Sequence, residues 1–454
     1  MRSAVLFVLL ISCCRSLLAA GEVHEFKLDN GLKLIVKEDH RAPVVVSQVW
    51  YGVGASYEHD GITGVSHVLE HMMFKGTDAH GPGEFSRIVS ENGGRENAFT
   101  SQDFTGYYQR LEQSRLPVSF ELEADRMRNL RLDEKEFRKE LKVVMEERRL
   151  RTDDKPTSLT YEQFMATAFT SSSYRIPTIG WMDDLENMEL GDLQQWYDRW
   201  YAPNNATLIV VGDVDPAAVL RLAKQYFEPL KPETIVPPKP RIEPEQPGTR
   251  RITVKVPAEV PYLVMGYKVP VLKTAEHDWE PYALAVLAGI LDGGNSARLA
   301  RELVRGSQIA SSAGASYSLY DRQSSLFLFD GTPANSHSVE QLEQALLAQV
   351  QRLKDAPVDK AELERVKAQT VASDVYQQDS MFYQGMAIGR LEAAGLPWTL
   401  KDEFVGRINA VTAEQIQAVA KTYLVDSGLT IAELEPLPMD TANAGSVAGG
   451  KHAN

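Results

Sequence analysis

The stretch Gly64-Val65-Ser66-His67-Val68-Leu69-Glu70-His71-Met72-Met73-Phe74 places two histidines and a glutamate in an apolar segment. Its apolar residues recur at helical spacing, which predicts a helix over 64–74. Residues four apart share a helix face, so His67 and His71 can point at one metal ion while Glu70 lies beside them. Two neutral imidazoles suit Zn²⁺, and a catalytic zinc site also needs a third protein ligand and an open position. The alternative is a helix surface with two solvated histidines.

The predicted site helix is apolar over most of its circumference, because Val65, Val68, Leu69 and Met72 surround the polar residues. We therefore expect this helix to be largely buried. Burying histidines and a glutamate without partners is costly, and a bound metal ion would supply the partner. The pattern thus favours a metal site over a solvated surface.

A second helix, predicted over 133–151, could supply the third ligand. Glu140 and Glu147 lie one heptad apart, with Val143 and Val144 between them on the same face. Acidic residues within an apolar stripe often mark a functional site. The alternative is a charged helix surface in solvent, and this is the environment that we expect for Glu146, Arg148 and Arg149.

The residues from Gly64 to Thr77 closely resemble the site helix of the inverzincins. These are zinc metallopeptidases of the pitrilysin and insulinase type, which include mitochondrial processing peptidase, and their inverted motif is His-x-x-Glu-His. The resemblance implies that His67, His71 and Glu147 hold one Zn²⁺ per chain. It also implies that Glu70 is the general base toward the zinc-bound water, and that Glu140 orients a ligand histidine from behind.

The function implied by this resemblance is that of a zinc-dependent endopeptidase that hydrolyses peptides or small proteins. The alternative is a non-catalytic subunit of the same family that acts as a scaffold or assembly factor. Such subunits usually lose motif residues, whereas all of them are present here. A third interpretation, a metallohydrolase for small molecules, is disfavoured by a further motif that suggests peptide binding.

This further motif lies in the segment from Gly93 to Tyr108. It resembles the glycine turn and the edge strand of the same family, along which an extended substrate is added by backbone hydrogen bonds. The resemblance implies that Asn97, Ala98, Phe99 and Thr100 bind the peptide substrate. The alternative is an ordinary hairpin.

The composition is that of a folded globular chain. Of its 454 residues, 43% are hydrophobic and 24% are charged, which argues against a disordered or multi-span membrane protein. The net charge is −14, with 48 Lys and Arg against 62 Asp and Glu. The chain thus lacks the positive charge that dominates nucleic-acid binding. We expect no nucleic-acid partner and no transmembrane span.

The amino-terminal residues have the layout of a secretory signal peptide. Arg2 precedes an apolar run over 4–11, and small residues follow at 19–21. We therefore expect residues 1–20 to be removed from a periplasmic or secreted protein. The alternative is a lipoprotein anchored through Cys13, because Leu10-Ile11-Ser12-Cys13 resembles a bacterial lipobox.

A proline-rich segment over 229–250 divides the chain. Proline removes backbone donors and fixes φ, so this segment is predicted to be a stiff extended linker. It would join a zinc-binding catalytic domain at 21–228 to a second, inactive homologous domain at 251–436. Residues 437–454 have the composition of a disordered tail.

Both halves begin with strand patterns and continue with helical ones, so the chain looks like a diverged duplication. The strand patterns lie at 25–36 and 44–53 in the first half, and at 251–256 and 262–267 in the second. Hairpin-like neighbours of this kind predict an α+β fold rather than a doubly wound parallel sheet. The resemblance implies two similar α/β-sandwich domains of the processing-peptidase type that form a clamshell.

The second half departs from the family pattern at one point. Family members commonly carry an arginine and a tyrosine there that hold the substrate and stabilise the oxyanion, but Val304 and Ser311 fall at these positions. We therefore predict a heterodimer with a similar chain that carries the pair. The alternative is that Tyr317 or Tyr320 replaces the missing donor, which would give a self-sufficient enzyme or a homodimer.

Overall fold

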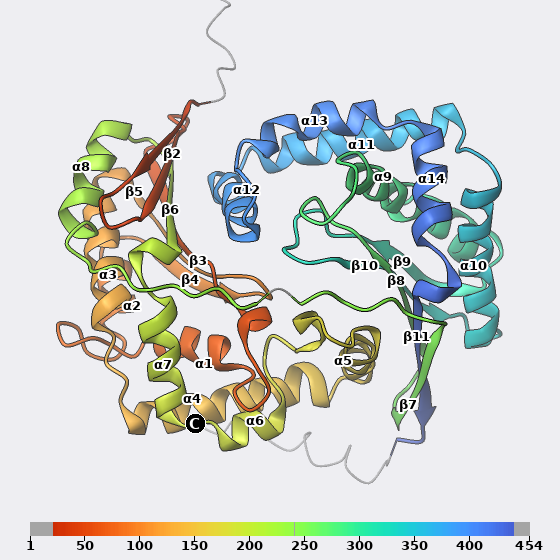
Figure 1. Ribbon diagram of the computed structural model, residues 1–454, viewed down its shortest axis with the longest axis horizontal. Helices are drawn as coiled ribbons and strands as arrows, with labels where there is room; N and C mark the ends of the chain where they lie inside the picture. Colours follow the sequence, from red (N-terminus) through yellow and green to blue (C-terminus); the bar gives the residue numbers. More distant parts are fainter. Residues whose placement is uncertain (1–20, 240, 440–454) are drawn as a thin grey trace, which may run out of the picture.

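The structure, a computed structural model, describes residues 21–239 and 241–439. The predicted signal peptide with Cys13 and residues 440–454 of the predicted tail lie outside the described residues. The chain forms two α/β halves that stand side by side (Figure 1), each built on one β-sheet with helices packed against it. The architecture confirms the predicted pair of similar α/β domains.

The first sheet has six strands in the order β1-β2-β6-β3-β5-β4. Neighbouring strands are antiparallel except β2 and β6, which are parallel. The strands β2, β3 and β6 are central and rich in β-branched residues, so most of their side chains are buried. Strand β4 forms one edge of the sheet. The strands are β1 (Val23–Lys27), β2 (Lys33–Glu38), β3 (Val44–Tyr51), β4 (Arg95–Thr100), β5 (Thr105–Glu112) and β6 (Ala206–Gly212).

The second sheet has five strands in the order β7-β11-β8-β10-β9. Within the described residues of this sheet, β7 and β11 run parallel and the other neighbouring strands are antiparallel. Both sheets are therefore mainly antiparallel, as the sequence predicts. The strands are β7 (Arg250–Pro257), β8 (Tyr262–Val269), β9 (Ala310–Ser316), β10 (Ser325–Pro333) and β11 (Leu429–Leu437).

Helices cover both sheets and form a separate hydrophobic core with each of them. The first half contains α1 (Val65–Met72), α2 (Glu84–Glu91), α3 (Leu116–Asn129), α4 (Glu134–Arg148), α5 (Pro156–Ala168), α6 (Met182–Asn187), α7 (Leu190–Trp200) and α8 (Pro216–Tyr226). The second half contains α9 (Glu280–Asp292), α10 (Val339–Asp355), α11 (Lys360–Gln377), α12 (Met381–Ala394), α13 (Leu400–Ala410) and α14 (Ala413–Tyr423). Among the described residues, no helix is long and apolar enough to cross a membrane.

The segment 25–36, expected as one strand, forms a hairpin instead. Strands β1 and β2 pair with Glu25 opposite Ile35. The turn between them contains Gly31 at φ +92°, a conformation that strains any residue with a side chain. The Asn30 side chain accepts the N–H of Leu32 at 3.2 Å and closes the turn. Asn-Gly is a turn signal that should have divided the predicted strand.

One helix of each half packs against the sheet of the other half. Helix α5 of the first half buries Phe164 against Val264 of the second sheet. Helix α12 of the second half buries Ile388 against Trp50 of the first sheet. A Cβ at Gly389 would lie 2.1 Å from Trp50, so this close approach requires glycine. In Figure 1, α12 lies above and α5 below the space between the halves.

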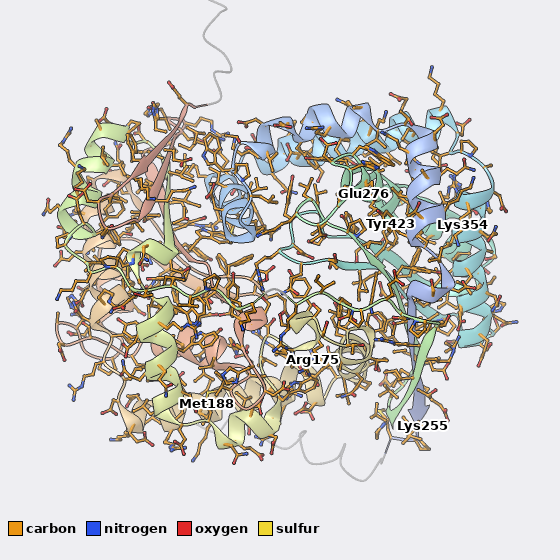
Figure 2. The ribbon with its side chains drawn as sticks, in the orientation of Figure 1. Arg175, Met188, Lys255, Glu276, Lys354 and Tyr423 are labelled. Atoms are coloured by element: carbon orange, nitrogen blue, oxygen red, sulfur yellow. The ribbon has the colours of Figure 1, made fainter. Side chains whose placement is uncertain are left out.

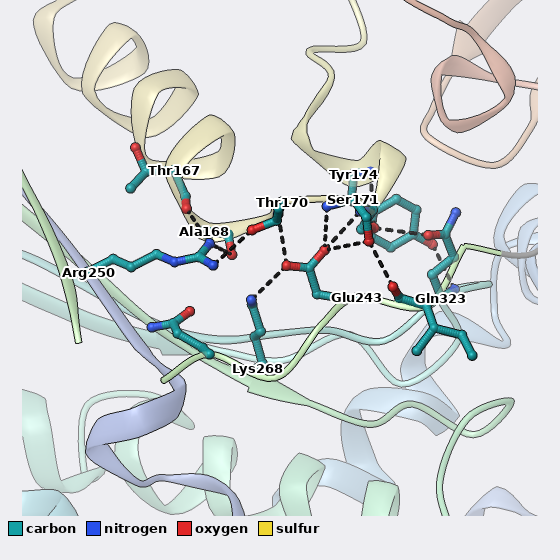
Figure 3. Close-up of polar contacts among 12 residues, drawn as sticks. Thr167, Ala168, Thr170, Ser171, Tyr174, Glu243, Arg250, Lys268 and Gln323 are labelled. Atoms are coloured by element: carbon teal, nitrogen blue, oxygen red, sulfur yellow. Dashed lines mark hydrogen bonds and ion pairs between the residues drawn. The ribbon is translucent and has the colours of Figure 1, made fainter. Parts of the chain in front are cut away.

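The proline-rich segment is held in place by hydrogen bonds and an ion pair of Glu243. Between 230 and 249 its described residues form no helix or strand. The Glu243 carboxylate accepts the N–H groups of Thr170 and Ser171 at 2.8 Å and of Ser172 at 2.9 Å. It also lies 2.8 Å from Lys268 Nζ on β8 (Figure 3). One carboxylate therefore joins the linker to both halves.

Candidate metal centre and active site

Helix α1 begins where two glycine-containing segments meet. Gly64 has φ +88° and Gly180 has φ +86°, and a Cβ at Gly64 would lie 2.7 Å from the carbonyl oxygen of Ile179. The Glu58 carboxylate accepts the N–H groups of Gly64 at 2.7 Å and Ser66 at 2.8 Å. A carboxylate at a helix N-terminus satisfies free N–H groups and complements the helix dipole. Glu58 thus fixes the start of the site helix.

Helix α1 is buried on its apolar face, as the sequence predicts. The buried side chains include those of Val65, Val68, Leu69 and Met72. The remaining face carries His67, Glu70 and His71, and all three line a cavity. The helix therefore presents its polar residues to this cavity.

His67, His71 and Glu147 converge on one point. Their ligand atoms all lie within 4.8 Å of one another. Glu147 carboxylate oxygens lie 3.9 Å from His67 Nε2 and 3.5 Å from His71 Nε2. Burial, with His71 and Arg151 nearby, lowers the pKa of His67 to about 3. The His67 imidazole is therefore neutral and keeps a lone pair for a ligand bond.

Helix α4 brings Glu140 and Glu147 to the site from the edge of its buried face. Phe137 and Val144 are fully buried, and the two glutamate side chains are 13% and 17% exposed. Val143 is 47% exposed, so the expectation that it shares an apolar face with them is wrong. Since 3.6 residues make one turn, Val143 lies on the far side of the glutamates from the buried stripe.

Of the three charged residues that we expected in solvent, two are exposed, one on α4 and one in the turn that follows it. Glu146 and Arg149 form an exposed ion pair. Arg148 is buried instead, and its guanidinium donates to Glu162 at 2.7 and 2.9 Å and to the carbonyl oxygen of Gly180 at 2.8 Å. The expectation for Arg148 is wrong because the loop that contains Gly180 folds back over α4.

Glu140 lies behind His71. Its carboxylate is 3.3 Å from His71 Nδ1 and 2.7 Å from Lys75 Nζ. A carboxylate at Nδ1 fixes the tautomer in which Nδ1 carries the proton. His71 Nε2, on the side of Glu147, is then free to bind a metal ion.

Glu70 projects from α1 toward β4. The Thr100 hydroxyl donates to Glu70 Oε2 at 2.6 Å. Burial raises the pKa of Glu70, and the hydrogen bond from Thr100 opposes this effect. The Glu70 carboxylate lines the cavity beside both histidines, where it can accept a proton from a water molecule.

Strand β4 pairs with β5 on one side only, within the part of the chain that the structure describes. Asn97, Ala98, Phe99 and Thr100 all line the cavity. Phe99 packs against Trp50 with ring centroids 5.1 Å apart, whereas Thr100 reaches Glu70 on the opposite face. The second edge of β4 can therefore accept an extended peptide.

The cavity that contains these residues measures about 1440 Å³ and is lined by both halves. The lining from the first half includes residues of α1, β4 and α5, and the lining from the second half consists of Tyr262, residues between Ser316 and Leu328, Arg390 and Ala394. Arg175, which also lines the cavity, lies below the centre of the molecule in Figure 2. The volume exceeds the roughly 300–1,000 Å³ of small-molecule pockets, so the cavity suits a longer ligand.

The two positions expected for an arginine and a tyrosine lie away from this cavity. Val304 packs against the second core, and Ser311 lies on β9 and is exposed. Tyr317 and Tyr320 do line the cavity. The Tyr317 hydroxyl donates to the carbonyl oxygen of Pro270 at 2.7 Å. Tyr317 is therefore engaged within its own half.

The sequence matches two family models. Residues 33–180 match "Insulinase (Peptidase family M16)" and residues 187–370 match "Peptidase M16 inactive domain". The zinc protease PqqE of Helicobacter pylori is 36% identical over 357 residues, which cover 78% of this chain and 79% of that protein. The chain belongs to peptidase family M16.

Solved structures agree with membership of family M16. The crystal structure of a protease from Helicobacter pylori has a TM-score of 0.87 at 32% identity, and the match covers 92% of this chain and 100% of that chain. A chain of complex III2 from Candida albicans has a TM-score of 0.75 at 16% identity and covers 91% of this chain and 96% of its own length. The second likeness shows a shared fold alone.

Sequence reasoning missed Arg151, whose Nη1 lies 2.6 Å from Glu147 Oε1. Arg151 belongs to a π-helical turn, Arg149–Asp153, that follows α4. Its side chain is 72% exposed and lines the cavity. Such turns frequently occur at functional sites in proteins. The available signal was the spacing of four residues from Glu147, which places both side chains on one helix face.

Proposed function

We propose that this M16 chain is a zinc-dependent endopeptidase in which His67, His71 and Glu147 hold one Zn²⁺ and Glu70 is the general base. The observation that carries the proposal is the convergence of these three ligands beside Glu70, in a cavity large enough for a peptide. Two neutral imidazoles and one carboxylate are a donor set that suits catalytic zinc. The fit of these residues to the metal supports the proposal.

Each residue has a separate task in the proposed reaction. Bound zinc would act as a Lewis acid that polarises a peptide carbonyl and acidifies water. Glu70 takes the proton from the attacking water and delivers it to the leaving amine, because its carboxylate lies in the cavity and is held by Thr100. Glu140 keeps His71 in the tautomer that can bind metal.

We propose that the peptide substrate is added to the free edge of β4, along Asn97, Ala98, Phe99 and Thr100. The backbone of β4 would provide affinity for any extended peptide, and the cavity walls would select side chains. The position of this edge next to Glu70 supports the assignment, since a bound strand would pass the metal centre.

The test compares wild type with Glu70→Gln, purified with any associated chain retained. The substitution removes the base and leaves the three ligands, so hydrolysis of a quenched peptide should fall at least about 100-fold. Zinc content by mass spectrometry should stay at one per chain. Zinc loss in the variant, or full activity, would show that Glu70 has another role.

The second candidate function is a non-catalytic scaffold or assembly subunit. The match of residues 187–370 to a domain described as inactive, and the fold shared with a chain of complex III2, favour it. The presence of His67, Glu70, His71 and Glu147 favours the peptidase. Zinc binding without hydrolysis of any peptide, by wild type with its associated chains, would support the scaffold.

We also propose that the active form is a heterodimer with a similar chain that carries the arginine and tyrosine pair. The location of Val304 and Ser311 away from the cavity supports this proposal. The chain purified alone should then be poorly active. Full turnover by a monodisperse single-chain species would instead favour Tyr317 or Tyr320 as the donor, or a homodimer.

Export to the periplasm or medium is proposed from residues 1–20 alone. N-terminal sequencing should find a mature chain that begins near Gly21, and a lipid on Cys13 would support the anchored alternative. The domain boundaries 21–228 and 251–436 stay a prediction, since the second matched range already begins at 187.

A further inference from the structure

The buried carboxylate of Asp103, in the first half, accepts hydrogen bonds from residues of both halves. Asp103 is 5% exposed. It accepts hydrogen bonds from Ser56 Oγ at 2.7 Å and from the Tyr174 hydroxyl. Arg322, in the loop between β9 and β10 of the second half, donates to it through its backbone N–H at 3.0 Å and its Nε at 3.1 Å. This bonding connects the two walls of the cavity.

Arg322 makes contacts that suit a guanidinium in particular. Its Nη2 donates to Ser56 Oγ at 2.7 Å while Nε donates to Asp103. The guanidinium carbon lies 4.3 Å from the centre of the Tyr57 ring. A planar group with several fixed donors can stack and bond at once, and a lysine ammonium cannot reproduce this arrangement.

The hydrogen bonds among Ser56, Asp103, Tyr174 and Arg322, here called the network, hold the turn that follows β4. Asp103 lies in the turn 101–104, between β4 and β5. The Ser56 N–H donates to the carbonyl oxygen of Gln102 at 2.7 Å, and the Ala55 N–H donates to that of Ser101 at 3.1 Å. Arg322 therefore restrains the turn through Asp103 and through Ser56.

Thr100 immediately precedes this turn and donates to Glu70 at 2.6 Å. Within the described part of the chain, the Thr100 hydroxyl is the hydrogen-bond donor that holds the Glu70 side chain. The position of the carboxylate thus depends on where β4 ends. None of the network bonds reaches α1 or α4, which carry the three metal ligands.

We propose that Arg322 is a positioning residue, which fixes Thr100 and thereby Glu70 from the second half of the molecule. This inference rests on the proposed role of Glu70 as the base. Small misplacement of a reacting group lowers turnover far more than binding. Loss of Arg322 should therefore reduce kcat and leave zinc in place.

The first test is steady-state hydrolysis of a quenched peptide by Arg322→Ala. We expect kcat to fall about 10- to 100-fold and KM to change by less than about 3-fold. Added guanidinium should restore part of kcat. The Arg322→Lys variant should also have a reduced kcat, because a lysine ammonium lacks the planar set of donors of a guanidinium. The matched control is Arg407→Ala, which removes an exposed ion pair with Asp278 that lies outside the cavity lining.

The second test does not depend on activity. Hydrogen exchange of the segment 95–108 should accelerate in Arg322→Ala and slow again with guanidinium, whereas Arg407→Ala should match wild type. Asp103→Asn keeps a side chain of the same shape but removes the ion pair, so it should reproduce both effects if the alanine variant does not fold. Unchanged exchange and a kcat equal to the control would overturn the proposal, as would joint loss of zinc and kcat. Wild type that shows no hydrolysis when it is purified with its associated chains would instead refute the proposed function.

Discussion

Among the three proposed ligands, Glu147 supplies the single carboxylate, so the proposed metal centre should depend on it most. Glu147→Gln should weaken zinc binding by at least about 10-fold and lower hydrolysis with it, since a neutral amide replaces a charged ligand. Zinc affinity measured by competition with a chelator checks this expectation. Glu146→Gln is the matched control, because Glu146 is 64% exposed on the same helix. Equal zinc affinities for both variants would mean that the third ligand is another residue, with Glu140 as the first candidate.

Glu243 is a residue whose charge links stability to pH. Burial alone would raise its pKa, but Lys268 and the backbone N–H groups of Thr170, Ser172 and Ser171 lower it to about 2. A depressed carboxyl pKa adds stability that is present above the ordinary value of about 4.5 and is lost as pH falls toward 2. Glu243→Gln should therefore lower the thermal midpoint at pH 7, and its effect should shrink below pH 4.5 and become small only at about pH 2. Glu245→Gln, in the exposed part of the same linker, is the control, and equal midpoints for both at pH 7 would contradict this account.

At the scale of elements, helix α12 is held to the first sheet by close approach of its backbone. Gly389→Ala should lower the thermal midpoint, because the new Cβ would lie 2.1 Å from Trp50 and overpacking typically costs about 1–3 kcal/mol. Gly406→Ala on the neighbouring helix α13 is the control. A Cβ there meets nothing within 4 Å, so the higher helix propensity of alanine should leave stability equal or slightly higher. A stable Gly389→Ala with an unchanged midpoint would show that α12 packs loosely.

The elements also show how far the sequence could predict the structure. Helical spacing was sufficient to predict the helix of His67 and His71, and the acids at Glu140 and Glu147 pointed to the helix that faces it. Periodicity did not reveal that Arg148 is covered by a distant loop or that Asn30 and Gly31 divide a strand. The first error arises because burial depends on tertiary contacts. The second arises because a turn signal was outweighed by β-rich neighbours.

At the scale of the whole molecule, two features could not be predicted from the sequence. One is the packing of α5 and α12 against the sheet of the opposite half, and the other is the hydrogen bond between Arg322 and Asp103. These contacts join residues that lie far apart in the chain, such as Asp103 and Arg322. A local pattern contains no information about such pairs. The cavity between the halves follows from these contacts, and the proposed peptidase function requires this cavity as much as it requires the metal ligands.

The central claim, a peptidase that depends on one zinc ion, is tested most directly by metal titration. The protein, purified with its associated chains and freed of metal by chelation, is given Zn²⁺ in steps while hydrolysis of a quenched peptide is followed. We predict no hydrolysis without metal, a linear rise, and a plateau at one equivalent per chain that bears His67, His71 and Glu147. Hydrolysis that survives metal removal would contradict the account, as would a plateau at a different number of zinc equivalents per chain.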